Sequence, residues 1–192
     1  MRKWWVLAIV LPLAAVSGVF LVSRASAPSH GERKLPAPLR DQLAARVVEA
    51  LEHDPTFRTE VTREPGPRPV CVATVFGVAP DRAATINEVH TIYSWVNCSW
   101  LGPADLAKGP AGLDVSRLLG LSMPVALQLG PPVTYQVPAD GEEHAASIWR
   151  IFPEPLVAAA FSPPGPSLGH ALQERILHVV GSSPAPPSST PS

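Results

Sequence analysis

The sequence predicts an α+β domain in which an antiparallel sheet of about four strands is packed by an N-terminal helix and by C-terminal helices, with one disulfide and a preceding transmembrane helix. Three observations support this fold class. The middle of the chain holds stretches rich in Val, Ile, Thr and aromatic residues, apolar residues recur at helical spacing on either side of them, and two cysteines fall within the β-rich stretches. The 192 residues, 46% hydrophobic and 16% charged, suffice for one buried core. A formal charge of −1 gives no electrostatic footprint for nucleic acid, so no such partner is expected.

Residues 1–23 predict a transmembrane signal-anchor. After Arg2 and Lys3, an uncharged run of 19 residues extends from Trp4 to Val22, and as a helix it would be about 28 Å long, enough to cross the bilayer core. A charged start followed by an apolar run is how export signals are built, so we expect a single-pass protein of the cell membrane with its C-terminal domain outside. The alternative is secretion after signal cleavage, because Ala25-Ser26-Ala27 has the small-x-small pattern of a signal-peptidase site.

Beyond the anchor, composition divides the chain into three further segments. Residues 24–37 mix Ser, Pro and charged residues and predict a stalk. Residues 38–181 form the predicted extracytoplasmic α+β domain. Residues 182–192 contain only Ser, Thr, Pro and Ala, which leaves no large apolar side chain to bury and predicts a disordered tail.

The first elements of the domain are a helix and a β-hairpin. Pro38 suits the first turn of a helix, Pro55 follows it, and an apolar residue recurs every four positions between them. This predicted buried stripe consists of Leu39, Leu43, Val47 and Leu51. The two β-rich stretches, 70–78 and 88–101, are predicted to pair as an antiparallel hairpin.

Two shorter strands and three helices complete the domain. Residues 102–122 are expected to form a long loop with at most one helical turn around 115–119. Strands follow at 123–129 and 133–137, and we expect helices to cover one face of the resulting sheet. Asp140 and Glu143 have the pattern of a capping box for a helix that ends at Pro153. A short helix over 154–161 comes next, and a last helix is predicted from a Ser167 cap to a stop at Gly181.

The cysteine pair can meet across the predicted hairpin. If Cys71 lies opposite Cys98, the same register places Ala73 opposite Val96 and Phe76 opposite Tyr93. Directly opposite residues in a non-hydrogen-bonded pair have Cα atoms about 4.5 Å apart, within the range of a disulfide. We therefore predict a Cys71–Cys98 disulfide in an oxidising compartment. The alternative, for a cytosolic domain, is two buried thiols.

Chemical motifs are scarce. The six histidines lack zinc-ligand spacing, and no phosphate-binding or dinucleotide-binding loop is present, so no metal site, cofactor or catalytic residue is predicted. Glu142, Glu143 and His144 are interpreted as charges in the first turn of a helix. If the protein were an enzyme with catalytic residues dispersed in sequence, Glu88, His90 and His144 would be the candidates.

Trp95 and Trp100 differ by an odd number of positions, so on one strand they point to opposite faces. With a one-sided core, one of them would be exposed near Tyr93, where it could stack on a sugar or a partner protein, unless a loop such as 102–122 covers it.

Four segments resemble small exported or membrane-anchored proteins of unassigned function found in high-GC actinobacteria: 70–78, 93–98, 137–141 and 151–153. The resemblance implies location and fold class but no activity. We therefore expect a non-catalytic binding or structural module of the cell envelope, anchored in the membrane by its N-terminal helix. Its partner would be an envelope protein or a glycan. The alternatives are a secreted or envelope enzyme and a structural subunit of a membrane complex, the latter using the small residues Ala14, Ala15 and Gly18 of the span.

Overall fold

The computed structural model describes residues 35–62 and 67–183. Leu35 begins the compact unit to which these residues belong. The predicted membrane span, most of the stalk and the tail beyond residue 183 lie outside the described residues. Within the described ranges, no helix combines the length and apolar character that crossing a membrane requires.

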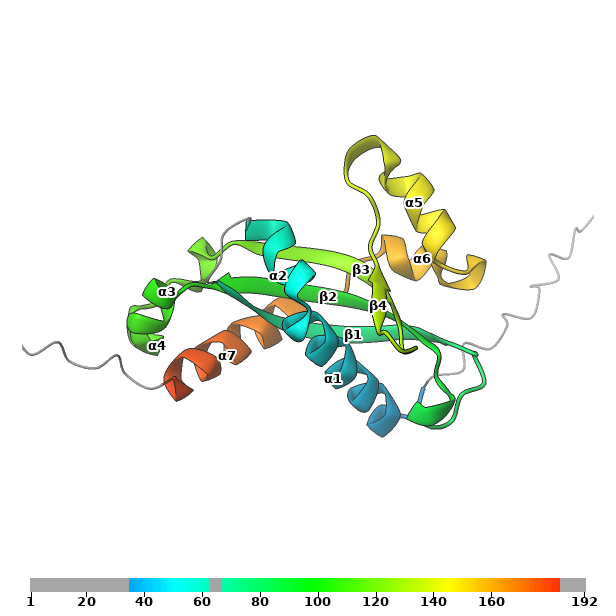
Figure 1. Ribbon diagram of the computed structural model, residues 1–192, viewed down its shortest axis with the longest axis horizontal. Helices are drawn as coiled ribbons and strands as arrows, with labels where there is room; N and C mark the ends of the chain where they lie inside the picture. The colour runs from blue at the N-terminus through cyan, green and yellow to red at the C-terminus, as the bar shows by residue number, and fades with distance from the viewer. Residues whose placement is uncertain (1–34, 63–66, 184–192) are drawn as a thin grey trace, which may run out of the picture. The chain divides into compact units, whose positions relative to one another are not determined.

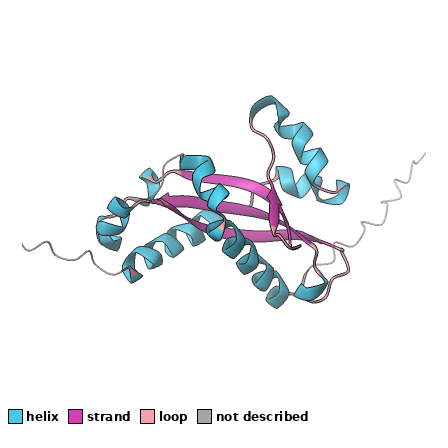
Figure 2. Ribbon diagram, viewed as in Figure 1, coloured by secondary structure: helices cyan, strands magenta, loops and turns pink. Residues whose placement is uncertain are grey.

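The predicted sheet is confirmed. Four antiparallel strands lie in the order β1-β2-β3-β4 (Figures 1 and 2). Their bounds are β1 Arg68–Ala79, β2 Thr91–Leu101, β3 Gly120–Gln128 and β4 Thr134–Gln136. Each strand pairs with its neighbour in sequence, so β1 forms one outer edge of the sheet and the short β4 lies at the other.

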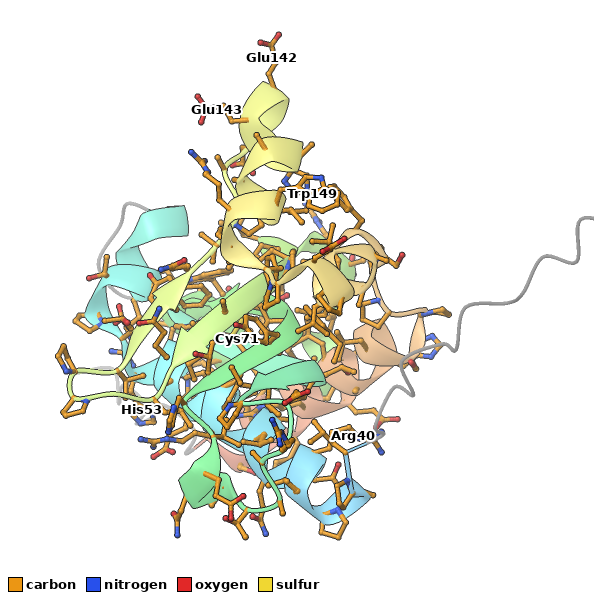
Figure 3. The ribbon with its side chains drawn as sticks, turned by 90° about the vertical axis from the view of Figure 1, so that its right-hand side faces the viewer. Arg40, His53, Cys71, Glu142, Glu143 and Trp149 are labelled. Carbon is orange, nitrogen blue, oxygen red and sulfur yellow. A yellow bond between two sulfur atoms is a disulfide. The ribbon has the colours of Figure 1, made fainter. Side chains whose placement is uncertain are left out.

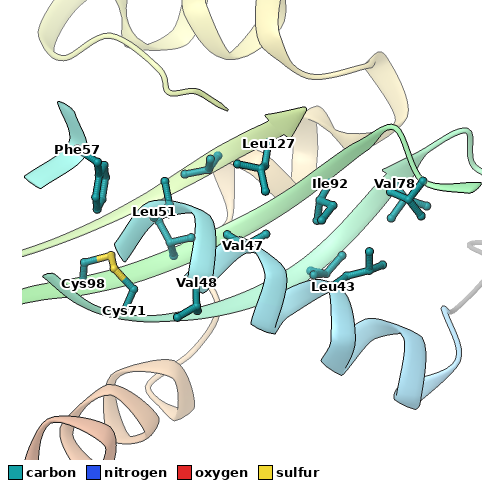
Figure 4. Close-up of a cluster of buried hydrophobic side chains, with 14 of the residues drawn as sticks. Leu43, Val47, Val48, Leu51, Phe57, Cys71, Val78, Ile92, Cys98 and Leu127 are labelled. Atoms are coloured by element: carbon teal, nitrogen blue, oxygen red, sulfur yellow. A yellow bond between two sulfur atoms is a disulfide. The ribbon is translucent and has the colours of Figure 1, made fainter. Parts of the chain in front are cut away.

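Helices cover both faces of this sheet, which corrects the expectation of a single covered face. Helices α1 (Ala37–His53) and α2 (Pro55–Thr62) pack on one face, where α1 supplies the buried residues Leu39, Leu43, Val47, Val48 and Leu51 (Figure 4). The opposite face packs against α6 (Glu154–Phe161) and α7 (Ser167–Ser182), and α5 (His144–Ile151) packs on α6. Neighbouring residues of β2 such as Ile92 and Tyr93 therefore belong to different clusters and are both buried.

The segment after β2 contains more helix than the sequence predicts. Two short helices, α3 (Pro103–Ala107) and α4 (Gly109–Gly112), and the 3-10 turn η2 (Val115–Arg117) occupy most of the expected loop. Pro103 at the start of α3 removes an N–H that would have no helical partner, and the Asp105 carboxylate accepts the Gly102 N–H 3.1 Å away. The single turn expected around 115–119 is thus the last of three short helical pieces.

The C-terminal helices differ from the prediction at their ends. The Asp140 capping box does not form, because residues 141–143 make the 3-10 turn η3 (Gly141–Glu143), Asp140 makes no capping bond, and Gly141 adopts a left-handed φ of 69°. Helix α6 has the predicted bounds. Ser167 is the first residue of α7 rather than its cap, and Gly181, which has no positive φ, continues the helix to Ser182.

The Cys71–Cys98 disulfide is confirmed, with an S–S distance of 2.05 Å. Its register is the predicted one as far as Val75 opposite Ser94. The predicted pairing of Phe76 with Tyr93 is wrong, because a bulge between Val75 and Gly77 places Gly77 opposite Tyr93. At Gly77 the side chain of Leu156 in α6 comes so close that a Cβ atom would overlap it, so the missing side chain lets α6 dock on β1.

Candidate functional site

The outer edge of β1 carries backbone groups that the sheet does not use. In an antiparallel pair, residues at the closely spaced, non-hydrogen-bonded positions direct their N–H and C=O groups away from the partner strand. The Cα atoms of Cys71 and Cys98 are 4.1 Å apart, which identifies such a position. Every second residue of this stretch therefore presents its backbone outward: Pro69, Cys71, Ala73 and Val75.

Only part of this edge is free. Pro69 has no N–H to donate, and the Cys71 N–H donates to Glu52 Oε1 of α1 at 2.8 Å. For the N–H groups of Ala73 and Val75, no acceptor is found among the described residues. The edge of β1 is therefore blocked at its start and open for strand pairing from Ala73 to Val75.

A groove lies over the open part of the edge, between α1 and α7. Its volume is about 350 Å³, and its floor is formed by Val72, Ala73 and Thr74. The side chains of its walls are small or apolar except for one arginine: Ala44, Ala45 and Val48 from α1, and Ser167, Leu168, Ala171 and Arg175 from α7. Both helices contact β1, and Figure 1 shows them on the β1 side of the sheet. We call this feature the β1 groove.

A charged contact closes one end of the β1 groove. The Arg175 Nη2 atom lies 3.0 Å from each carboxylate oxygen of Glu52, the same group that accepts the Cys71 N–H. Next to it is a pocket of about 120 Å³ lined by Glu52, His53, Arg58, Arg68, Pro69, Val70 and Val179. The open end of the groove is thus uncharged, whereas the closed end is rich in basic side chains.

The opposite side of the sheet offers a poorer edge. Strand β4 covers β3 only from Ala126 to Gln128, which leaves the earlier part of β3 unpaired on that side. The outward-facing residues there are Ser122 and Pro124. They lie opposite Asn97 and Trp95 of β2, whose backbone groups point toward β1, so the backbone groups of Ser122 and Pro124 point away from β2. Pro124 has no N–H, so this edge cannot continue a ladder as β1 can.

The dispersed candidates for catalysis come from two separate segments of the fold. Glu88 ends the 3-10 turn η1 (Ile86–Glu88), where its carboxylate accepts the Ala84 N–H at 2.8 Å and this bond lowers its pKa. His90 lies in the same β1–β2 connection, whereas His144 begins α5 and its Nδ1 lies 3.1 Å from the Ala139 oxygen. Across residues 35–62 and 67–183, no three His, Cys, Asp or Glu side chains cluster as metal ligands would.

Glu142 and Glu143, interpreted from sequence as first-turn charges, lie in η3 at the tip of the α5 segment and are exposed (Figure 3).

The tryptophans are arranged differently from the expectation. Trp95 is buried beneath α6, where its Nε1 donates to the Ala159 oxygen at 2.8 Å. Trp100 is buried on the opposite face, 5.6 Å from Phe57 of α2 between ring centroids. Neither residue is exposed, because helices cover both faces, and the cover over Trp95 comes from α6 rather than from a loop such as 102–122. Among the tryptophans of the described residues, the exposed one is Trp149 on α5, with 59% of its surface accessible (Figure 3).

Sequence reasoning missed the residues that define the groove. Glu52 follows the buried Leu51 on an amphipathic helix, and Arg175 precedes the buried Ile176, so both look like ordinary boundary charges. Their separation of 123 residues leaves no local signal of their contact. The uncharged edge run from Pro69 to Ala79, which lacks the charges that commonly protect an edge strand, is the one available signal.

Comparison with known proteins found no matching family model, curated protein or solved structure.

Proposed function

We propose that this protein is a non-catalytic binding module of the cell envelope that receives an extended peptide segment of a partner protein along β1. The observation that supports it is the outward-facing backbone of Ala73, at the floor of the β1 groove, followed by that of Val75, the next outward-facing residue along the strand. An added strand would exchange backbone hydrogen bonds with both residues, which is the source of affinity in strand-addition complexes.

The walls of the groove suit a peptide better than a flat partner. The side chains of an added strand alternate between the two faces of the sheet, so one set would point toward α1 and the other toward α7. Ala44, Ala45 and Ala171 leave room there for larger apolar side chains. Because the groove walls are uncharged apart from Arg175, we expect the side chains of the bound stretch to be apolar or small and uncharged.

The disulfide supports an oxidising location. Structural disulfides persist outside the cytosol, and Cys71–Cys98 lies in the sheet that builds the site. Together with the predicted anchor in residues 1–23 and the resemblance to exported actinobacterial proteins, this favours a domain held at the outer surface of the cell membrane. There it would bind a segment of another envelope protein.

The test uses the full-length chain in detergent micelles and a synthetic library of random hexapeptides. We expect the library to yield binders whose affinity falls by about tenfold or more in Ala45→Trp, which fills the groove, and in Ala73→Pro, which removes one outward N–H without breaking the ladder to β2. Ala146→Trp, at an exposed position of α5, is the matched control and should change affinity less than twofold. Failure to select any binder, or equal binding by Ala45→Trp and the control, would overturn the proposal.

A further inference from the structure

We infer that the partner segment is the C-terminus of a polypeptide, and that its free carboxylate binds at the Arg175 end of the β1 groove. This inference rests on the proposed function and specifies the substrate class of the same site. The carboxylate would accept the Ala73 N–H and donors of the Arg175 guanidinium, and the preceding residues would pair with β1 toward Val75.

The Glu52 carboxylate supplies the first argument, because it already binds in this way. It accepts an outward N–H of the β1 edge, that of Cys71, and contacts Arg175 Nη2 at 3.0 Å. The next outward N–H, that of Ala73, lies about 7 Å further along the strand. A second carboxylate at that position would repeat the arrangement that the protein forms internally.

The donor capacity of Arg175 supplies the second argument. A guanidinium group has five N–H donors in a planar fork, and the contact of Arg175 with Glu52 uses Nη2 alone. The Arg175 side chain is 38% exposed and is the one charged side chain that lines the β1 groove. It can therefore hold Glu52 on one side and face a ligand on the other.

The way in which this end of the groove is blocked supplies the third argument. A peptide that continued past this end would have to cross the Glu52–Arg175 contact and Pro69, which has no N–H, so the ladder stops here.

These constraints fix the direction of the bound segment. With its carboxylate beside Ala73 and its earlier residues beside Val75, the segment runs antiparallel to β1. Its last side chain would enter the groove between Val48 of α1 and Ala171 of α7, the lining residues one helical turn from Glu52 and Arg175. We therefore expect selectivity for a small or apolar C-terminal residue.

The experiment compares two forms of the same hexapeptide library, one with free C-terminal carboxylates and one with C-terminal carboxamides, on the full-length chain. We expect the free-acid peptides to bind about tenfold or more tightly, as for loss of a charge-assisted hydrogen bond. Arg175→Gln should reduce this preference to less than twofold. Glu52→Gln keeps an acceptor for the Cys71 N–H but removes the competing charge, so it should tighten the binding of free-acid peptides selectively.

The outcomes separate this inference from the proposed function. Equal binding of the two forms, or an unchanged preference in Arg175→Gln and Glu52→Gln, would overturn the carboxylate site while leaving strand addition in place. Absence of binding by either form would overturn both. A free-acid preference that is lost on raising the salt concentration and in Arg175→Gln supports the site at Arg175.

Discussion

Glu52 of α1 and Arg175 of α7 meet at 3.0 Å across the outer edge of β1, although they are 123 residues apart in sequence. The two helices cover opposite faces of the sheet, and the same carboxylate accepts the Cys71 N–H of the strand between them. One side chain thus connects both helical layers to the edge strand. Exposures of 38% for the Arg175 side chain and 20% for that of Glu52 distinguish this contact from a fully solvated ion pair.

We expect Glu52→Ala to lower the free energy of unfolding by about 1 to 3 kcal/mol, because it leaves the Cys71 N–H and the Arg175 guanidinium without their acceptor. Glu52→Gln should cost less, since its amide oxygen can still accept the N–H. Urea denaturation measures both. Glu49→Ala is the control, because it removes an exposed ion pair with Arg46 and should change stability by less than about 0.5 kcal/mol. Equal losses in Glu52→Ala and Glu49→Ala would contradict the role given to Glu52.

Removal of the disulfide is expected to cost more. The bridge joins residues separated by 27 positions, and closing a loop of that length stabilises a folded chain by about 3 to 4 kcal/mol in the chain-entropy model. The double variant Cys71→Ala, Cys98→Ala should lose that amount in urea denaturation. The wild type unfolded in the presence of a reductant should lose a similar amount. An unchanged midpoint in both measurements would show that the bridge does not stabilise the domain.

Gly77→Ala tests the docking of α6. The added Cβ would overlap the Leu156 side chain, so that side chain must move. The movement is costly because Leu156 is packed against the buried cluster between the sheet and α6. We expect a loss of about 1 to 3 kcal/mol, the usual cost of overpacking. The double variant Gly77→Ala, Leu156→Ala should show a positive coupling, with a combined loss smaller than the sum of the single ones. Strict additivity would mean that the two residues do not contact each other.

Substitution by phenylalanine should lower the free energy of unfolding clearly at Trp95 and very little at Trp149. Trp95→Phe removes the 2.8 Å hydrogen bond to the Ala159 oxygen, which keeps the Ser162 N–H as its other donor, and shrinks a buried ring, so it should cost about 1 to 3 kcal/mol. Trp149→Phe changes a side chain that is 59% exposed, and its effect should stay within about 0.5 kcal/mol. Thermal and urea denaturation of the two variants give the comparison. A larger loss for Trp149→Phe would reverse the assignment of buried and exposed rings.

Asp105 provides a test of pH dependence. Its hydrogen bond with the Lys108 ammonium group, 2.9 Å long, is the main cause that lowers its pKa, and the Gly102 N–H acts in the same direction. The ionised carboxylate therefore stabilises the folded state above the pKa it has in the unfolded chain, and this contribution is lost as the pH falls through the lower folded-state pKa. The stability difference between wild type and Asp105→Asn should accordingly shrink from pH 7 to pH 3. A constant difference would contradict the shift.

The elements that sequence predicted are those whose pattern is local. The four-residue spacing of Leu39, Leu43, Val47 and Leu51 identified the buried side of α1, and all four are buried. The bounds of α6 followed from Pro153 and from the apolar run up to Phe161. Local pattern failed at the bulge near Gly77, because the register there depends on how closely α6 approaches the strand.

The β1 groove could not be predicted because it depends on tertiary placement. That β1 is an edge follows from strand order, and that its Ala73 N–H is open follows from where Glu52 and Arg175 lie. Covering of the second face by α7 likewise depends on where the chain returns after α6. Residues 92–96 of β2 carried a partial signal, since a run of large apolar side chains interrupted only by Ser94 is typical of a strand buried on two faces.

The first described strand, β1, is covered in part by the last described helix, α7. Val70 of β1 and Leu101 of β2 are buried against Ile176 and Val180 of α7, so this apolar surface stays in water until residues near 180 are available. Contacts of such long sequence separation slow folding and expose partly folded chains to aggregation. A polypeptide cut short before α7 would keep its hairpin but leave apolar surface and the β1 edge uncovered together. Correct folding of the domain therefore requires that α7 packs on the sheet before a second, partly folded chain pairs with that edge.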